Sequence, residues 1–383
     1  MTGLPLEGLT VVSLEQAVAA PFATRQLADL GARVIKIERP EGDFARGYDR
    51  AVRGMSSYYV WLNRGKESVV LDLKSTLGQD ALRALVASAD VFVQNLAPGA
   101  IDRLGFGVDE LTSINPRLIY VSVSGFGEGG PLADRKAYDL LVQCEAGLLS
   151  VTGTPEAPAK AGISLADIAT GMYAYSGILT ALLHRATTGH GDVIEVSMLE
   201  ALGEWMMQPY LYSEYGGTQQ PRSGAEHATI APYGPFDTVD GVIYLAVQND
   251  REWVALCEAV LRDPGLARDA RFTDNSARVI NRGDLNERIA APLRSLTTAE
   301  ARELLDASNV ANAELRNMAD FSAHPQLQAR HRWSEIGSPN GPVRVLVPPV
   351  TARFSETRMG AVAELGQHTE AVLAELAEGK SGS

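Results

Sequence analysis

The stretch TVVSLEQAVAAPFATRQLADLGARVIKI, residues 10–37, decides the fold class of this chain. It begins and ends with short apolar runs of the kind that form buried strands, and an amphipathic segment lies between them. Pro21 suits the first turn of a helix, and Gly31 stands where the end of that helix needs a left-handed residue. The stretch therefore predicts strand, helix and strand, the unit from which parallel sheets are built.

The same alternation of apolar runs and amphipathic segments continues through the first half of the chain. We expect further strands at 68–71, 91–94, 118–124 and 193–196, with helices between most of them. The pattern predicts an α/β fold with an open parallel sheet.

A different pattern begins near Gly224. Residues 233–248 predict two strands joined by a turn at Asp240 and Gly241, and helical segments follow. We read this part as a second, smaller α+β domain. The predicted organisation is a large domain over 1–200, a linker helix over 201–223, the small domain over 224–330, and a connector returning to the large domain over 331–383.

Length and composition exclude several classes of protein. The 383 residues exceed the size at which one hydrophobic core usually stops growing, and the net charge of -13 disfavours nucleic acid and anionic membranes as partners. Cys144 and Cys257 are too few for a disulfide framework, and the six histidines include no pair at metal-ligand spacing on a helix. No signal peptide and no long apolar span is visible. We expect a cytoplasmic protein that binds no metal.

A long helix is predicted over 165–188, where apolar residues recur three or four apart. Ser164 is a candidate N-cap and Gly189 a candidate stop. Asp167 then falls in the first helical turn, where an acidic residue often does no more than cap the helix. From the residues alone, capping and chemistry are both open for Asp167.

Two ligand patterns follow the predicted strands. Gly125, Gly127 and Gly130 match the dinucleotide glycine fingerprint, but Pro131 comes next and no apolar-faced helix opens there, so nicotinamide or flavin binding is disfavoured. Basic residues follow four strands, and the carboxyl ends of parallel strands share one edge of a sheet. The sequence therefore favours an anionic ligand held by a set of four residues, Arg39, Lys74, Arg103 and Lys136.

Several longer segments together resemble the class III coenzyme A transferases, the group of formyl-CoA transferase and carnitine CoA-transferase. The likeness covers nearly the whole chain. It is carried by LADLGARVIKIERPEGD (27–43), NRGKESVVLDLK (63–74), VQNLAPGAIDRLGF (93–106), NPRLIYVSVSGFG (115–127), KAYD (136–139), LADIATGMYA (165–174), LLHRATTGHGDVIEVSM (182–198) and GQHTEAVL (366–373).

The resemblance implies a Rossmann-like large domain, a small domain, and two chains interlocked in a homodimer. It implies transfer of CoA from an acyl-CoA to a carboxylic acid through an aspartyl thioester, with no permanently bound cofactor. Its nucleophile falls on Asp167, within the pattern of Asp, two residues, Thr and Gly. Its CoA contacts fall on Val18, Arg39, Leu71, Lys74, Asn95, Arg103 and Lys136. We expect Asp167 at the helix N-terminus to be ionised and little changed in basicity.

Two features separate this chain from particular relatives. The related acyl-CoA racemases have a catalytic Gly-His-Asp motif where Ala137, Tyr138 and Asp139 stand here. A tyrosine is poorly suited to proton exchange at neutral pH, so a transferase is favoured over a 2-methylacyl-CoA racemase or epimerase. The glycine-rich loop of formyl-CoA transferase has no counterpart around 225–240. A non-catalytic CoA-binding protein is the third hypothesis.

The opening segment, residues 15–32, resembles the subgroup acting on four- and five-carbon dicarboxylates such as succinate, mesaconate, itaconate and citramalate. Such an acceptor needs a cation for its distal carboxylate, which Arg46 or Arg25 could supply. Tyr138 and Asp139 are further candidate substrate contacts. The expected partners are therefore an acyl-CoA, a small carboxylic acid and a second copy of the chain.

Overall fold

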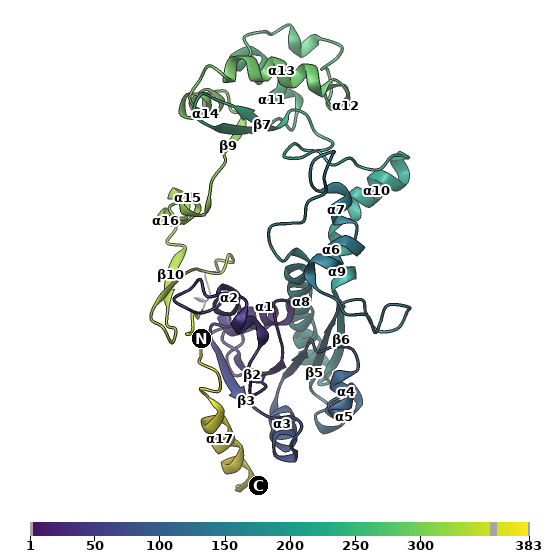
Figure 1. Cartoon of the computed structure of the whole chain (residues 1–383), viewed down its shortest axis with the longest axis vertical. Coiled ribbons are helices and arrows are strands. Elements are labelled where there is room, and N and C mark those ends of the chain that lie inside the picture. The colour runs from purple at the N-terminus through teal and green to yellow at the C-terminus, as the bar shows by residue number, and fades with distance from the viewer. Residues whose placement is uncertain (1–2, 353–357, 382–383) are drawn as a thin grey trace. The chain divides into compact units, whose positions relative to one another are not determined.

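In a computed structural model of the chain, the apolar runs form one six-stranded sheet (Figure 1). All neighbouring strands are parallel, in the order β3-β2-β1-β4-β5-β6. The strands are β1 (Thr10–Leu14), β2 (Arg33–Glu38), β3 (Lys66–Val70), β4 (Val91–Gln94), β5 (Ile119–Ser124) and β6 (Asp192–Ser197). The α/β fold and the six predicted strands are confirmed, with every boundary within two residues. This strand order is that of the dinucleotide-binding folds, whose ligands bind where the order reverses, here between β1 and β4.

The structure describes residues 3–352 and 358–381, and they group into two units. The first unit contains Met1–Gly147, Ala161–Gln208 and Gln326–Ser383, and the second contains Leu148–Lys160 and Pro209–Pro325. The connector expected over 331–383 includes 353–357 and 382–383, which lie outside the described residues.

Helices cover both faces of the sheet because strand side chains point alternately to its two faces. Val11 packs in one cluster with α1 and α8, whereas Val12 packs in another with α3, α5 and α17. The helical segments assigned to the first unit are α1 (Ala19–Asp29), η1 (Phe44–Gly47), α2 (Ser57–Leu62), α3 (Thr76–Ser88), α4 (Ala100–Arg103), α5 (Val108–Ile114), α6 (Asp139–Glu145), α8 (Leu165–Thr188), α9 (Met198–Trp205), and α17 (Thr369–Ser381). Helices α10 (Met207–Gly216) and α16 (Pro325–Ala329) cross the unit boundaries.

Several predicted helix ends are confirmed. α1 contains Pro21 in its first turn, and Gly31 after it has a φ of 101°. α8 ends before Gly189, whose φ of 79° is left-handed, as a glycine allows. None of the described helices is both long and apolar enough to span a membrane.

The first unit also contains the C-terminal segment. A two-stranded antiparallel sheet joins β10 (Trp333–Ile336) to β11 (Val343–Leu346). Further on, the chain covers the edge strand β3: Ser68 N–H donates to His368 Nδ1 at 3.1 Å, and Val70 N–H donates to Thr369 Oγ1 at 2.9 Å. These side chains satisfy donors that an open sheet edge would expose.

The second unit is built on an antiparallel sheet in the order β7-β8-β9. The predicted hairpin over 233–248 is confirmed, with its turn at Asp240 and Gly241. Helices surround a core that includes Trp253 and Phe272. The elements are α7 (Leu148–Val151), β7 (Tyr233–Asp237), β8 (Val242–Ala246), α11 (Asp250–Ala255), η2 (Leu256–Val260), η3 (Leu266–Arg268), α12 (Asn275–Ile280), α13 (Arg282–Leu293), α14 (Thr298–Ala307), β9 (Ala311–Glu314) and α15 (Met318–Ser322).

Candidate active site

Two cavities in the first unit open at the carboxyl ends of the strands. The smaller, of about 440 Å³, lies beyond β1, β2 and β3. The larger, of about 1200 Å³, lies beyond β1, β4 and β5, and both Asp139 and Asp167 line it. Gln16 and Leu96 line both cavities. The larger cavity therefore lies at the reversal of strand order, where ligands bind in folds of this type.

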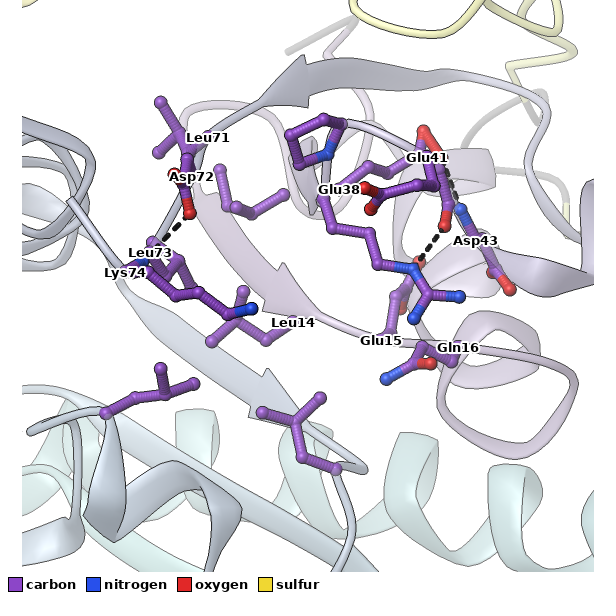
Figure 2. A pocket seen from close by; sticks show the side chains of 16 residues that line it. Leu14, Glu15, Gln16, Glu38, Glu41, Asp43, Leu71, Asp72, Leu73 and Lys74 are labelled. Atoms are coloured by element: carbon purple, nitrogen blue, oxygen red, sulfur yellow. Dashed lines mark hydrogen bonds between the residues drawn. The ribbon is translucent and has the colours of Figure 1, made fainter.

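The smaller cavity is lined by leucine side chains and by charged side chains of both signs (Figure 2). Leu14, Leu71 and Leu73 line its interior, and Lys74 extends alongside Leu73 in Figure 2. Arg39 is also part of the lining, and its Nε donates to Gly42 O at 2.9 Å, which orients the guanidinium. Carboxylates line the cavity as well, among them Glu41 and Asp72. Leucine side chains together with the cations Arg39 and Lys74 suit a ligand that joins a flat ring to phosphates.

The structure divides the predicted CoA contacts between the two cavities. The smaller is lined by Arg39, Leu71 and Lys74, and the larger by Val18, Asn95 and Lys136. Arg103 lines neither cavity and donates to Pro98 O at 3.4 Å. Their roles in binding CoA stay predictions.

Asp167 stands in the first turn of α8, and Asp139 caps that turn from another helix. Asp139 Oδ1 accepts from Ala166 N–H at 2.8 Å and from Asp167 N–H at 3.3 Å. Its Oδ2 accepts from Gln143 Nε2 at 2.7 Å. Ser164 occupies the N-cap position, but its side chain makes no capping bond. Sequence spacing could not identify this cap, because it comes from a residue 28 positions before Asp167.

The N-terminus of α1 faces Asp167. The N–H of Ala19, the first residue of α1, is directed at the Asp167 carboxylate and favours its ionised form. The turn before it is held by Asn95, whose Oδ1 accepts from Gln16 N–H and whose Nδ2 donates to Gln16 O, each at 2.8 Å. The Asn95 side chain therefore positions this turn as well as lining the cavity.

Gly171 lets α1 approach α8 closely at this point. A Cβ on Gly171 would lie 2.6 Å from Ala19 O and 3.0 Å from Phe22 Cβ, closer than packed atoms allow. Asp167 and Gly171 are four residues apart and share one helix face. Because Gly171 has no side chain, α1 approaches this face of α8 closely, and the α1 amide reaches the Asp167 carboxylate.

The surroundings of Asp167 change its acidity. Burial of the carboxyl group, followed by the negative charge of Asp139, raises the pKa of Asp167 to about 7, while the Ala19 N–H opposes this rise. The expectation of an almost unchanged basicity is therefore wrong, because desolvation and a like charge outweigh a helix N-terminus. Near neutral pH both protonation states are populated, and the ionised form is a stronger nucleophile than an ordinary carboxylate.

Aromatic side chains that the sequence analysis missed line the larger cavity. Phe44, Tyr48 and Tyr58 form a row with ring centroids 5.7 and 5.5 Å apart. Burial, and then the charges of Asp43 and Asp167, raises the pKa of Tyr48 to about 12, so its hydroxyl stays a neutral donor. No strand end or apolar period pointed to these residues, since Phe44 and Tyr58 lie in the short helices η1 and α2 and Tyr48 directly follows η1, and helices this short show no clear period. The predicted Tyr138 also lines this cavity.

The two arginines proposed for the acceptor are engaged elsewhere. Arg46 donates to Glu38 through Nε at 2.8 Å and Nη2 at 2.7 Å, and its guanidinium stacks over the Tyr59 ring. Arg25 lies 3.9 Å from Asp29. Neither arginine lines either cavity. The role of Arg46 at the acceptor stays a prediction, and its ion pair gives the side chain a competing structural role.

Comparison with known proteins identifies the family. A family model described as CoA-transferase family III matches residues 6–369.

This chain belongs to CoA-transferase family III.

Its relatives share both length and fold. An acetyl-CoA:oxalate CoA-transferase from Acetobacter aceti is 38% identical, over 89% of this chain and 89% of that protein. A succinyl-CoA:glutarate CoA-transferase from Mus musculus is 32% identical, over 97% of this chain and 86% of that protein. The crystal structure of a CAIB/BAIF family protein from Brucella suis superposes with a TM-score of 0.86 at 34% identity, covering 98% of this chain and 100% of that one. The predicted family is confirmed.

Replacing Asp139 by Asn should move the pH profile of this family III enzyme. Removing the negative charge beside Asp167 lowers the pKa of Asp167, so the acid limb of kcat/KM should shift to lower pH by at least about half a unit. Steady-state rates between pH 5 and 9 measure the shift. Glu145→Gln neutralises a carboxylate at the other end of α6 that pairs with Arg135, and it should leave the limb in place. An unmoved limb in Asp139→Asn contradicts the coupling.

Proposed function

We propose that this enzyme moves CoA from an acyl-CoA to a short dicarboxylic acid, with Asp167 as the nucleophile. The observation that carries the proposal is the placement of Asp167: it lines the larger cavity at the strand reversal, with a pKa raised to about 7 and the α1 N-terminus against it. Family III membership supports the reaction class.

Each half of the transfer balances without water or an external proton. The Asp167 carboxylate attacks the thioester carbon and CoA leaves as thiolate, which produces an aspartyl-acyl anhydride. The thiolate then attacks the aspartyl carbonyl, releasing the donor acid and leaving an aspartyl-CoA thioester. The acceptor carboxylate repeats these steps in reverse: it displaces thiolate to form a second anhydride, and the thiolate attacks the acceptor carbonyl. Asp167 is regenerated as carboxylate and the new acyl-CoA departs.

The chain's own groups supply binding and charge stabilisation. The nucleotide of CoA occupies the smaller cavity against Leu71, with its phosphates held by Arg39 and Lys74. Its pantetheine arm passes the shared lining residue Gln16 to reach Asp167. The Ala19 amide faces the aspartyl carbonyl on which oxyanions develop, and such donors act strongly where water is excluded. Remote binding of the nucleotide holds the thioester in line.

The acceptor binds among the tyrosine hydroxyls beside Asp167. Tyr48, Tyr58 and Tyr138 line the larger cavity, and Lys136 adds a cation. Relatives named for oxalate, glutarate, mesaconate and malate support a dicarboxylate. The proposed range is succinate, mesaconate, itaconate, citramalate and their short homologues.

Steady-state assays with succinyl-CoA test the substrate class. Each dicarboxylate is paired with a monocarboxylate of equal length, such as glutarate with pentanoate. We expect about a 10- to 100-fold higher kcat/KM for the dicarboxylate, since a hydrogen-bonded charge contributes about 1.5–3 kcal/mol. No transfer to any dicarboxylate would remove this part of the proposal. Uptake of deuterium at the α-carbon of a 2-methylacyl-CoA without any transfer would favour a racemase instead.

A homodimer and a cytoplasmic location stay predictions from the sequence. Light scattering measures the first: an interlocked pair has twice the 41.0 kDa mass of the chain. Exposed apolar side chains on α8, such as Leu183 at 73% exposure, are consistent with a covered surface.

A further inference from the structure

Asp43 and Lys36 form a buried ion pair beneath the turn that leads into α1. Asp43 Oδ2 lies 2.7 Å from Lys36 Nζ, and the two residues are 4% and 0% exposed. Lys36 also donates to Asn63 Oδ1 at 2.9 Å. Because each charge has a close partner of opposite sign or a hydrogen bond, the pair is satisfied without water. The second carboxylate oxygen of Asp43, Oδ1, is therefore available as a charged hydrogen-bond acceptor.

That second oxygen holds the turn before α1. Asp43 Oδ1 accepts from Ala17 N–H at 3.2 Å and from Ala45 N–H at 2.9 Å. Ala17 has a φ of 59°, a left-handed conformation that a residue with a Cβ adopts only when its surroundings enforce it. Two residues later comes Ala19, whose N–H is directed at Asp167 and whose carbonyl lies against Gly171 of α8. The bond to Asp43 thus supports a strained turn next to the reacting carboxylate.

We propose that Asp43 is a positioning residue for CoA transfer: held by Lys36, its carboxylate fixes the left-handed turn at Ala17 and so keeps the α1 amide on the nucleophile. The inference rests on the proposed role of Asp167. Asp43 itself touches none of the reacting atoms. It acts through the backbone of the turn, and Asn95 holds the same turn from the β4 side at Gln16.

Loss of the hydrogen bond from Ala17 N–H to Asp43 has a distinct kinetic signature. Ala17 relaxes toward a right-handed conformation, and the Ala19 amide moves away from Asp167. The nucleophile then loses a contact that favours its ionised form, so the acid limb of kcat/KM moves to higher pH. Among the described residues, the titratable groups that interact with Asp167 are Asp139 and Tyr48. Tyr48 also interacts with the charge of Asp43, so the variants that are compared must remove that charge alike. A loss of stability alone does not move the limb.

Two double variants test whether residue 43 must offer an oxygen that accepts the hydrogen bond from Ala17 N–H. Asp43→Asn/Lys36→Gln keeps an oxygen for Ala17, whereas Asp43→Ala/Lys36→Gln does not, and neither leaves a buried charge unpaired. With succinyl-CoA and the best acceptor, the first should stay within about threefold of wild-type kcat with its limb unmoved. The second should lose about 10- to 100-fold in kcat and shift its limb upward by at least about half a unit, with little change in the KM for acyl-CoA.

Controls separate this inference from the fold and from the proposed nucleophile. Asp29→Asn breaks another buried pair, that with Arg64, and should lower the melting temperature without moving the limb. Should the Ala/Gln chain not fold, Asp43→Ser/Lys36→Gln, whose hydroxyl is one bond shorter than the carboxylate, replaces it. Equal kcat and equal limbs in the compared double variants overturn the inference. Failure to trap an activated Asp167 with hydroxylamine in the wild-type enzyme overturns the proposed function instead.

Discussion

Asp167→Asn is expected to abolish CoA transfer, lowering kcat by at least about 10³-fold, because a carboxamide cannot form the anhydride and thioester intermediates. Hydroxylamine added during turnover should convert Asp167 of the wild-type chain to a hydroxamate, which peptide mass measurement detects. The variant should retain its fold and its binding of CoA, since Arg39 and Lys74 lie in the other cavity. Transfer at a wild-type rate would leave a non-catalytic or different role for this residue.

The same substitution should stabilise the protein at alkaline pH. The pKa of Asp167 is raised to about 7 in the folded chain, so the folded state binds a proton more tightly than the unfolded state does. Stability associated with this group is complete below the ordinary pKa of Asp and is lost as pH rises through about 7. At about 1.4 kcal/mol per pKa unit, the loss at pH 8.5 is at most about 4 kcal/mol.

Thermal melts at two pH values check that expectation. Asp167→Asn should melt above the wild type at pH 8.5, and the difference should shrink toward pH 5, where the wild-type carboxyl is protonated. If the melting temperature of the variant lies below that of the wild type by the same amount at both pH values, the amide disturbs packing. Ionisation of the Asp167 carboxyl then does not destabilise the wild-type fold.

Gly171→Ala is expected to lower kcat by about 10- to 100-fold while the chain stays folded. The added Cβ meets Ala19 O at 2.6 Å, so α1 must move away from α8 and take the Ala19 amide from Asp167. Overpacking of this kind costs about 1–3 kcal/mol of stability, of which better helix propensity returns up to about 1. Kinetics and thermal melts of the purified variant measure both effects.

Gly177→Ala is the matched control on the same helix. Its Cβ would lie 3.4 Å from Ile194 Cγ2, an ordinary packing contact. The variant should keep wild-type kcat and gain a few tenths to about 1 kcal/mol in stability from helix propensity. If Gly171→Ala also keeps wild-type kcat, the close approach of the two helices does not set the rate.

Much of the fold was readable from local pattern. The strands β1, β2, β4 and β5 are largely buried and centre on apolar residues, whereas the edge strand β6 is mostly exposed. Gly31 and Gly189 end helices where a positive φ is required. These features depend on neighbours in sequence, so periodicity and turn chemistry reveal them. Residues 148–160 are different: their contacts group them with the second unit, and nothing in their own pattern indicates it.

The candidate site was readable only in part. The sequence pattern locates Arg39, Lys74 and Lys136 at the edge of the sheet where both cavities open, because the carboxyl ends of parallel strands lie together. Phe44, Tyr48 and Tyr58 were missed, since the helices that hold or adjoin them, η1 and α2, are too short to show an apolar period. The pKa of Asp167 was misjudged because burial and the approach of Asp139 are properties of the folded chain.

The sequence by itself determined the α/β class, the order of strands and helices along the chain, and the resemblance to family III with Asp167 as its candidate nucleophile. Only the tertiary structure decided how Asp167 behaves. Asp139 caps the helical turn that contains Asp167, the Ala19 amide is directed at its carboxylate, and Gly171 lets α1 pack closely against α8. Charge interactions and desolvation act through space over a few ångströms, and folding brings those groups together across as many as 148 positions of chain.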